Sequence, residues 1–497
     1  MSYINNRTLH DLKNSDRRYS TTGLMDIDMV NITAGQAESS TGGILLSGLR
    51  STGISGISID TRTLLPGDLF FAIRGPRNDG HDHLAAALSK GACGAVVDTG
   101  YDPGSSFPRD RILLQVENTH RALKDLAGDV RRLWRGSLIA VTGSMGKTTT
   151  KEFAAQVLQT EFSVYRSPGN WNNLFGLPLA IFGLGADDHI GVFELGMSAT
   201  GEIAEMCRIA RPDIGIITNV APVHLEFFGS IEEIARAKGE LVAGLPADGT
   251  LIYNGDDPLT RRMGAAFPGK RMTFGTDPGV DIRASQIETA GLNETRFQFT
   301  VRGVTLKAAL PLGGIHYVWN ALPAIALADH YRIPMEQVIE SLGHLKQTQM
   351  RGQILRFTEG FTVIDDSYNS NPRALARMIE TLSQVPSFER RVLVAGEMLE
   401  LGPESAALHR ECGAWAAEHA VDVVIGVQGS AAELVRGAIE RGFDERNTRF
   451  FAQAEAAADF VADTVRRGDL VLIKGSRGVR LEKVVQALQT RHEERKS

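Results

Sequence analysis

The amino-acid sequence predicts an α/β protein with three domains: a small α/β module, then two larger units built on mainly parallel sheets. The chain has 497 residues, more than one ordinary hydrophobic core accommodates. Short apolar runs alternate with helix-like stretches along most of it, the pattern of parallel sheets covered by helices. A glycine-rich turn at 142–149 joins an apolar run to a helical stretch, which indicates a phosphate-binding loop in the second unit.

The first domain is expected over residues 25–135. Residues 1–24 are polar, show no periodicity and lack the apolar core of a secretion signal, so we expect a disordered extension or an upstream start codon there. After them, short apolar runs alternate with glycine-rich turns, which is typical of a small α/β domain. The expected strands are 57–59, 69–73, 95–97 and 112–114, and the expected helix is 83–90.

The central domain is expected over 136–347, as a mainly parallel sheet with helices on both faces. The third is expected over 348–497, as a second, Rossmann-like doubly wound sheet joined to the central one by a bridge at 332–352. The expected strands are 137–141, 190–193, 214–217, 361–364, 391–394, 423–425 and 470–473, and the expected helices include 147–159, 319–330 and 479–492.

The composition is that of a soluble globular protein, with 43% apolar and 23% charged residues. A net charge of −6, with Lys and Arg spread among acids, argues against a nucleic-acid groove. No apolar run approaches the ~20 residues of a membrane-spanning helix. Cys93, Cys207 and Cys412 lie far apart, which favours buried free thiols in a reducing cytoplasm. We expect a monomer because no long apolar seam is evident.

The strongest local signal is the phosphate loop. A strand leads into a turn whose glycines let backbone N–H groups face a phosphate, and the following helix N-terminus adds favourable partial charge. Lys147 would neutralise the β- and γ-phosphates, and the Thr148 hydroxyl would reach Mg²⁺. The loop comprises Thr142, Gly143, Ser144, Met145, Gly146, Lys147, Thr148 and Thr149.

This loop alone leaves the type of nucleotide-binding protein open. Val141 stands where the common phosphate-loop pattern has its first glycine. A ligase, a kinase, a motor and a GTPase switch all use such loops, although the guanine-selecting Asn-Lys-x-Asp pattern is absent. The decision therefore depends on motifs elsewhere in the chain.

The loop is similar to the shortened phosphate loop of the Mur ligase family, and further motifs follow it in that family's order. GNWNN at 169–173 and GLP at 176–178 resemble the second motif, and ELGMS at 194–198 resembles the metal-binding strand end. The resemblance covers about 57–488, nearly the whole folded chain. Segments 219–224, 237–240, 365–372 and 474–477 complete the set.

Within this family, the chain is similar to the members that add D-alanyl-D-alanine. The relevant motifs are IDTR at 59–62, PGDL at 66–69, DGH at 79–81, DDSYN at 365–369 and GEMLELG at 396–402. The resemblance implies an ATP-dependent ligase that joins D-alanyl-D-alanine to UDP-N-acetylmuramoyl-tripeptide through an acyl phosphate. It also implies that the three domains close before chemistry, which keeps water from the acyl phosphate.

The resemblance further implies two Mg²⁺ ions and a set of ligands for them. Glu194 would join Thr148 on one ion, and His224 would bind the second. Lys238 matches the lysine that the family carbamylates, which would turn a cation into an anionic metal ligand. Without the motifs, these three residues would be interpreted as a solvated strand-end acid, a structural histidine and an exposed helix lysine.

The remaining site residues are likewise implied by the resemblance. Asn320 would contact adenine, Arg351 would reach the ATP phosphates and Asp366 would hold the ribose; Tyr317 stands where the family usually has Asn. Asn172 and Asn173 are expected to bind substrate, and Tyr368, Asn369 and Asn371 to shape the hinge side of the site. Lys474 and Ser476 are expected to face the incoming dipeptide or phosphate, with an anion site at a helix start as the alternative. The residues expected to hold the UDP-sugar are Thr61, Arg62, Asn78, Asp79 and His81, for which turn-forming polar residues are the alternative.

Two other functions remain possible on the sequence alone. One keeps the chemistry and changes the substrate, as in a neighbouring Mur ligase or a polyglutamate-adding relative, although the first-domain motifs argue against a folate ligase. The other is a nucleotide-binding scaffold or switch without ligase activity, which the joint presence of Lys147, Glu194, His224, Lys238 and Asp366 disfavours. The third peptide residue of the acceptor, diaminopimelate or lysine, stays open.

Overall fold

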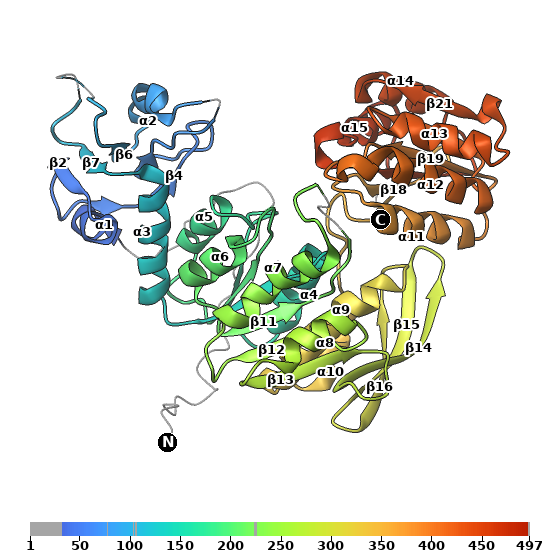
Figure 1. The fold of residues 1–497 in the computed structure, drawn as a ribbon, viewed down its shortest axis with the longest axis horizontal. Helices are drawn as coiled ribbons and strands as arrows, with labels where there is room; N and C mark the ends of the chain where they lie inside the picture. The colour runs from blue at the N-terminus through green and yellow to red at the C-terminus, as the bar shows by residue number, and fades with distance from the viewer. Residues whose placement is uncertain (1–31, 77, 103, 105–106, 223–225, 496–497) are drawn as a thin grey trace.

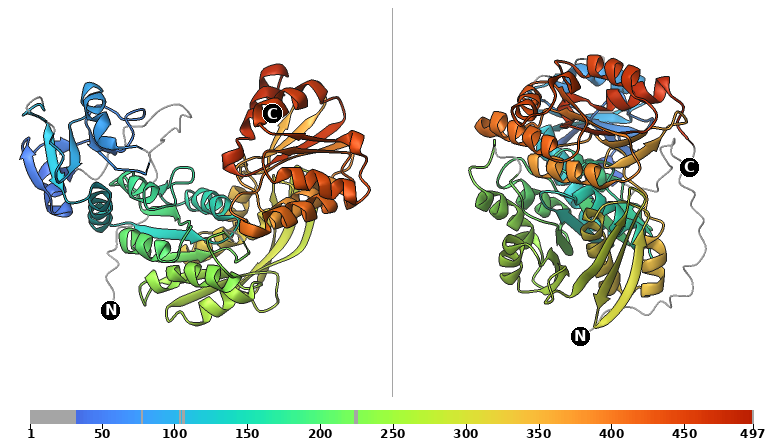
Figure 2. Two further views of the ribbon diagram at one scale, coloured as in Figure 1. Left: turned by 45° about the horizontal axis from the view of Figure 1, so that its top comes forward. Right: turned by 90° about the vertical axis from the view of Figure 1, so that its right-hand side faces the viewer.

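The computed structural model describes residues 32–76, 78–102, 104, 107–222 and 226–495. The expectations for residues 1–24 and for His224 lie outside these ranges. The chain forms three units, each with its own sheet, and the first (blue) and third (red) lie over opposite ends of the central one (Figure 1, Figure 2). In the described part of the chain, no helix is long and apolar enough to cross a membrane.

The first unit contains all four strands that the sequence predicts. Its sheet has the order β2-β7-β6-β5-β4, parallel except for the edge strand β2, and a short ribbon pairs β1 with β3. The strands are β1 (Ile32–Thr33), β2 (Ile44–Ser47), β3 (Gly53–Ile54), β4 (Gly56–Ser58), β5 (Asp68–Phe71), β6 (Gly94–Asp98) and β7 (Ile112–Val116); the helices are α1 (Ala34–Thr41), α2 (Leu84–Ser89) and α3 (Thr119–Leu133).

The helix α3, which we did not predict, fixes the first unit to the central one (Figure 1). It begins at the Asn118 cap and buries one apolar face, so that a single apolar cluster continues from the first unit into the central unit. At its far end Arg131 donates to the Ala210 carbonyl at 2.7 Å and to the Asp213 carboxylate at 3.0 Å. The first two units therefore pack as one body.

The central sheet has the order β16-β15-β14-β13-β12-β11-β8-β10-β9 among the described residues. Its parallel strands are β8 (Ser137–Thr142), β9 (Val164–Arg166), β10 (Ile190–Glu194), β11 (Ile214–Ile217), β12 (Thr250–Asn254), β13 (Lys270–Gly275) and β14 (Ile282–Ala290), which pairs with β13. The helices are α4 (Lys147–Leu158), α5 (Gly176–Phe182), α6 (Glu202–Ala210), α7 (Ile231–Gly244), α8 (Pro258–Ala265), α9 (His316–Tyr331) and α10 (Met335–Leu342).

One edge of the central sheet is antiparallel, which the sequence analysis did not predict. The strands β14, β15 (Glu294–Val301) and β16 (Val304–Leu310) form consecutive hairpins. The turn between β15 and β16 has positive φ at both Arg302 and Gly303, the backbone of a tight two-residue hairpin. The third unit lies next to this edge, because Leu292 belongs to its apolar cluster.

The third unit has the sheet order β17-β18-β22-β19-β20-β21, parallel except for β17. The final helix α15 begins at Glu482 rather than at 479, because Arg480 has a left-handed backbone that ends a short 3₁₀ turn. The strands are β17 (Gln353–Arg356), β18 (Thr362–Asp366), β19 (Arg390–Gly396), β20 (Val423–Val427), β21 (Thr448–Phe451) and β22 (Asp469–Lys474); the helices are α11 (Pro372–Gln384), α12 (Ser405–Glu418), α13 (Ala431–Glu440), α14 (Ala454–Thr464) and α15 (Glu482–Arg491).

Two glycines inside helices provide a matched test of packing in this fold. A Cβ at Gly413 of α12 would collide with the backbone of α13 at Leu434, whereas a Cβ at Gly128 of α3 would meet nothing within 4 Å. We expect Gly413→Ala to destabilise the third unit by about 1–3 kcal/mol through overpacking. Gly128→Ala should stabilise its helix by about 0.5–1 kcal/mol. Scanning calorimetry would measure both; equal effects of the two substitutions would contradict this account of the α12–α13 contact.

Candidate active site

The candidate site is a cavity of about 1240 Å³ that lies between the central and third units. The phosphate loop follows β8, which lies between β10 and β11, so it lies where the carboxyl ends of these parallel strands meet at one edge of the sheet. The loop forms the floor of the cavity. The third unit contributes residues that follow β18 and β22. One residue of the first unit, His120 at the start of α3, also lines the cavity.

The phosphate loop is held in shape by the end of the neighbouring strand β11. Gly146 has a φ of 80°, and a Cβ there would collide with the Asn320 amide, so the loop passes close to α9. The Met145 N–H donates to Asn219 Oδ1 at 3.0 Å, and Thr218 Oγ1 donates to the Met145 carbonyl at 2.6 Å. The backbone is thus arranged before any phosphate arrives.

Lys147 and the N-terminus of α4 supply positive charge to this loop. The Lys147 ammonium donates to the Gly143 carbonyl at 2.9 Å, so it lies folded over the turn. Burial lowers the pKa of Lys147, and Glu194 acts in the opposite direction. A charged lysine beside free helix N–H groups is a suitable environment for a polyphosphate.

Thr148 and Glu194 form the oxygen pair expected of a Mg²⁺ site. Glu194 is 2% exposed, accepts from Thr148 Oγ1 at 2.7 Å and accepts from Asn172 Nδ2 at 2.8 Å. The described ranges contain no group of three or more His, Cys, Asp or Glu that could hold a metal. A hydroxyl and one carboxylate nevertheless fit Mg²⁺, which commonly completes its shell with waters and substrate phosphates.

Lys238 of α7 lines the same cavity and is 2% exposed. Burial, with a further contribution from Lys147, lowers the pKa of Lys238 well below its ordinary value. Burial therefore favours the neutral amine at Lys238 more than in a solvated lysine. A neutral amine is the form that reacts with CO₂.

The residues expected to bind the nucleotide lie at the junction with the third unit. Asn320 lies beside the phosphate loop, where its Oδ1 accepts from Thr150 Oγ1 at 3.5 Å. Tyr317, which stands where the family usually has Asn, donates its hydroxyl to the Arg351 carbonyl at 3.0 Å. Asp366 forms a 2.5 Å ion pair with Lys474, whose ammonium also donates to the Asn369 carbonyl at 3.0 Å.

Arg351 connects the linker to the phosphate loop. Its guanidinium donates to Thr148 Oγ1 at 3.3 Å and lies 3.8 Å from the centre of the Tyr368 ring, a cation–π contact. A second guanidinium, that of Arg477, lies 6.0 Å from the same ring. The aromatic ring of the third unit therefore holds the arginine that reaches the loop.

Several other predicted residues line the cavity while their side chains stabilise the surrounding loops. Asn173 Oδ1 accepts from the Gly176 N–H at 2.8 Å at the start of α5. Asn371 Oδ1 accepts from the Ala374 N–H at 2.9 Å and caps α11. Ser476 Oγ accepts from the Leu399 N–H at 2.9 Å.

The five residues expected at the UDP-sugar, all in the first unit, are not among those that line this cavity. Arg62 is exposed and pairs with Asp60, and this ion pair lowers the pKa of Asp60 to about 2. His81 is buried: its Nε2 accepts from the Asp98 N–H at 3.0 Å, so its Nδ1 carries the proton donated to Asp79 at 2.5 Å. Both ring nitrogens of His81 thus order the turn. Thr61 and Asn78 lie in the same exposed turns.

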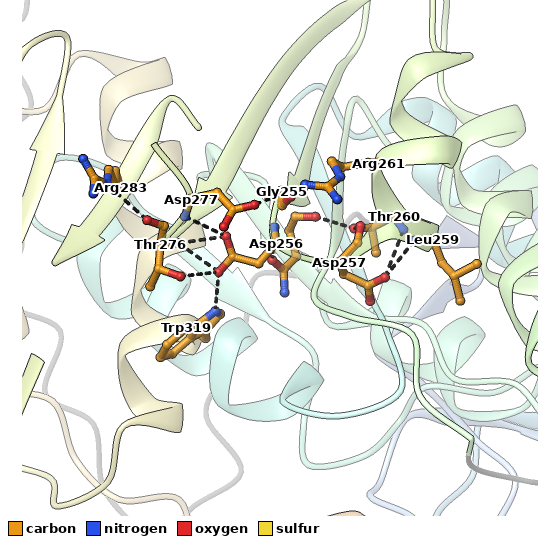
Figure 3. A network of polar contacts seen from close by, with 11 residues as sticks. Gly255, Asp256, Asp257, Leu259, Thr260, Arg261, Thr276, Asp277, Arg283 and Trp319 are labelled. Atoms are coloured by element: carbon orange, nitrogen blue, oxygen red, sulfur yellow. Dashed lines mark hydrogen bonds and ion pairs between the residues drawn. The ribbon is translucent and has the colours of Figure 1, made fainter. Parts of the chain in front are cut away.

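Sequence reasoning missed a polar network on the central side of the cavity (Figure 3). The Asp256 carboxylate accepts from Trp319 Nε1 at 3.2 Å and from the Thr276 N–H at 2.8 Å. Asp257 caps α8 and accepts from the Val220 N–H at 2.7 Å, which anchors the segment after β11. The signal was present as Asp-Asp-Pro at 256–258, a helix N-cap followed by proline at the first position.

Two histidines in the cavity wall were also missed. His120 of α3 stacks on Phe175 of the central unit, with ring centres 3.9 Å apart and a 7° angle between ring planes. His316 lies beside Tyr317, and burial lowers the pKa of His316 to about 4, so its ring is neutral at physiological pH. His316 lies in the 314–320 segment that contains Tyr317 and Asn320, which was a signal for it, whereas His120 has no motif that distinguishes it from a structural histidine.

The chain matches family profiles over three segments. These are described as Mur ligase family, catalytic domain (residues 53–131), Mur ligase middle domain (141–328) and Mur ligase, glutamate ligase domain (350–477). Together the segments include the phosphate loop, Glu194, Lys238, Asn320 and Lys474.

Curated proteins and solved structures resemble the chain along most of its length. It is 34% identical over 437 residues to the UDP-N-acetylmuramoyl-tripeptide–D-alanyl-D-alanine ligase of Bacillus subtilis strain 168, covering 88% of this chain and 93% of the relative. The ligase of the same name from Escherichia coli strain K12 is 33% identical over 441 residues, covering 88% and 94%. A crystal structure of MurF from Acinetobacter baumannii superposes with a TM-score of 0.82 at 28% identity, and the match covers 93% of this chain and 100% of that structure's chain. The crystal structure of MurF ligase from Thermotoga maritima in complex with ADP superposes with a TM-score of 0.75 at 28% identity. That match covers 88% of this chain and 97% of that structure's chain.

The contact between Tyr368 and Arg351 can be tested by two substitutions at one position. Tyr368→Ala removes the ring that holds the guanidinium, whereas Tyr368→Phe keeps the ring and removes only the hydroxyl. We expect the alanine variant to bind a non-hydrolysable ATP analogue about 5- to 30-fold more weakly, the value of a partly desolvated cation–π contact. The phenylalanine variant should bind within about threefold of the wild type. Calorimetric titration decides; equal losses in both variants would contradict the role of the ring.

Proposed function

This chain belongs to the Mur ligase family, and from that membership we infer that it joins D-alanyl-D-alanine to UDP-N-acetylmuramoyl-tripeptide with hydrolysis of ATP to ADP and phosphate. Relatives named for this reaction align with it over more than nine-tenths of their own length. One observation carries the inference: the phosphate loop, the Thr148–Glu194 pair and the Asp366–Lys474 pair all face one cavity. The product is UDP-N-acetylmuramoyl-pentapeptide, a precursor of peptidoglycan.

An amide cannot form directly from a carboxylate because oxide is a poor leaving group. In the proposed reaction, the acceptor carboxylate attacks the γ-phosphorus of ATP, which gives an acyl phosphate and ADP. The dipeptide amine then attacks the acyl carbon, loses a proton, and the tetrahedral intermediate expels phosphate. Lys147 and the N-terminus of α4 neutralise the transferred phosphoryl group, so the chain works by positioning and electrostatic stabilisation.

We propose that Thr148 and Glu194 hold one Mg²⁺, and that His224 and carbamylated Lys238 hold a second. Bound Mg²⁺ would neutralise negative charge on the phosphates. The short Thr148–Glu194 contact and the buried Glu194 carboxylate support the first assignment. The buried Lys238 amine, with its lowered pKa, supports the carbamate.

The three units supply the three substrates in this proposal, with boundaries at 25–135, 136–347 and 348–497. Asn320, Arg351 and Asp366 would hold the nucleotide; the proximity of Arg351 to Thr148 and the place of Asn320 beside the loop support this. Tyr368, Asn369, Asn371, Lys474 and Ser476 would face the dipeptide, with Asn172 and Asn173 on the facing wall. Thr61, Arg62, Asn78, Asp79 and His81 would form or order the UDP-sugar site.

We also propose a cytoplasmic monomer without a nucleic-acid partner. The free, buried cysteines Cys93, Cys207 and Cys412 support a reducing compartment. Burial raises the pKa of all three thiols, so they behave as small apolar side chains rather than reactive groups. The net charge of −6 supports the absence of a nucleic-acid partner.

The ligase assignment predicts an absolute requirement for four components. Phosphate release should need ATP, Mg²⁺, UDP-N-acetylmuramoyl-tripeptide and D-alanyl-D-alanine together, with a UDP-N-acetylmuramoyl-pentapeptide product by mass spectrometry. Omitting the dipeptide should abolish turnover, because the acyl phosphate is shielded from water. Turnover with a single amino acid, and none with the dipeptide, would replace the substrate and keep the nucleotide chemistry.

Carbamylation of Lys238 predicts dependence on CO₂ and on pH. Because the folded-state pKa of Lys238 is lowered, the reactive neutral amine is more populated than in a solvated lysine, and it is lost as the pH falls through that lowered pKa. Activity should fall severalfold after exchange into CO₂-free buffer and return with bicarbonate, and ¹³C-bicarbonate should give a carbamate NMR signal. Lys238→Met should lose both the dependence of activity on CO₂ and the carbamate NMR signal. Lys483→Met, which removes the lysine of an exposed ion pair with Glu455, should keep both. An active enzyme with no signal and no CO₂ effect would refute the carbamate.

A further inference from the structure

A second lysine of α4, Lys151, is buried more completely than Lys147 and has no part in the mechanism described above. It lies one helical turn after Thr148, so the two side chains occupy the same side of the helix. Its side chain is 0% exposed and does not line the cavity. Contact with substrate therefore does not explain why a lysine is buried at this position.

Three acceptors surround the Lys151 ammonium and use its full donor capacity. It donates to the Ser167 carbonyl at 2.5 Å and to the Gly169 carbonyl at 3.0 Å, and Glu152 Oε1 lies 3.1 Å away. The other carboxylate oxygen of Glu152 pairs with Arg166 at 3.0 Å. The ammonium thus ties α4 to the segment that follows β9.

The same segment holds one carboxylate oxygen and the backbone N–H of Glu194. Ser167 Oγ accepts from the Glu194 N–H at 3.3 Å, and Asn172 Nδ2 donates to Glu194 Oε1 at 2.8 Å. Asn172 is itself fixed, because its carbonyl accepts from the Gly196 N–H at 2.7 Å just beyond β10. A shift of this segment would therefore move the carboxylate that faces Thr148.

Burying an ammonium is costly, and an apolar side chain of similar volume would often be as stable or more stable at such a position. The cost is offset here only because every donor finds an acceptor at good distance. An apolar replacement would leave one buried carbonyl, that of Ser167, and one partly buried carbonyl, that of Gly169, without the lysine that donates to them. This arrangement is typical of a side chain that fixes the distance between two segments, here α4 and the segment that follows β9.

We propose that Lys151 is a positioning residue for the Mg²⁺-binding carboxylate: it fixes the 167–172 segment against α4 and thereby orients Glu194 toward Thr148. The proposal rests on the proposed function only in taking Thr148 and Glu194 as the Mg²⁺ ligands. Groups that orient a metal ligand in this way commonly change metal affinity by about 10- to 100-fold when removed. The phosphate contacts of the loop should remain, because Lys147 and the backbone N–H groups of the turn are unchanged.

The test is the affinity for ADP with and without Mg²⁺, measured by calorimetric titration of the full chain. In Lys151→Met we expect ADP affinity without Mg²⁺ to stay within about twofold, while the enhancement by Mg²⁺ falls about tenfold. Asn172→Ala should lose the enhancement to a similar degree. The double variant should lose no more than the larger single loss, because both act on Glu194.

Two further variants keep the inference falsifiable. Ser167→Ala leaves the lysine in place and removes the acceptor of the Glu194 N–H, so it should reduce the Mg²⁺ enhancement even if Lys151→Met fails to fold. Lys124→Met removes a half-buried lysine that pairs with Glu205 of α6 at 2.5 Å rather than with the segment, and should leave the enhancement unchanged. A folded Lys151→Met with the wild-type Mg²⁺ enhancement, or losses that add in the double variant, would overturn the proposal. Because binding needs no ligation, a wild type that binds MgADP but joins no dipeptide would refute the proposed function alone.

Discussion

The relative register of β10, β8 and β11 is the constraint on which the site depends. These parallel strands place Glu194 opposite Val141 and Ile217 opposite Thr142, so a carboxylate and the end of a third strand flank the phosphate loop. Moving one strand by one residue would turn each of these side chains to the opposite face of the sheet. This register brings Thr148 and Glu194 within hydrogen-bond distance. Asn172 then contacts Glu194, Arg351 contacts Thr148, and Lys151 is proposed to act on Glu194 through the 167–172 segment.

The contacts that bring the third unit to this pair are of a different kind. Besides the apolar contact of Leu292, they are polar: the Arg351–Tyr368 contact, the Tyr317–Arg351 hydrogen bond and the Arg351–Thr148 hydrogen bond. Each of these polar contacts involves groups that water can replace at modest cost, whereas the first and central units share a continuous apolar cluster. The molecule therefore has one junction stabilised by hydrophobic burial and another mainly by exchangeable polar contacts, and the cavity lies at the second.

The sequence predicted most of the buried strands and the loop that follows one of them, but it missed β12, which is buried along its whole length. The predicted runs are apolar on both faces, and the loop has glycines whose left-handed backbone the structure shows at Gly143 and Gly146. It did not predict the β14–β16 hairpins, because half-exposed strands such as β14 have a weaker apolar pattern and twist through positive-φ turns. Lys151 could not be found either. Its charge pattern is that of a surface helix, and only tertiary packing shows that its partners are backbone carbonyls.

The packing of α3 against the central unit limits how such a protein can change over evolutionary time. The face of α3 that enters the shared core must match α5 and α6, and Arg131 must find the Ala210 carbonyl at the far end. Recombination that brings in a first unit from a relative would therefore have to carry a compatible surface on the central unit as well. The first unit is thus expected to change by substitution rather than by exchange of the whole module, whereas the third unit, held by a linker and mainly polar contacts, is the more interchangeable part.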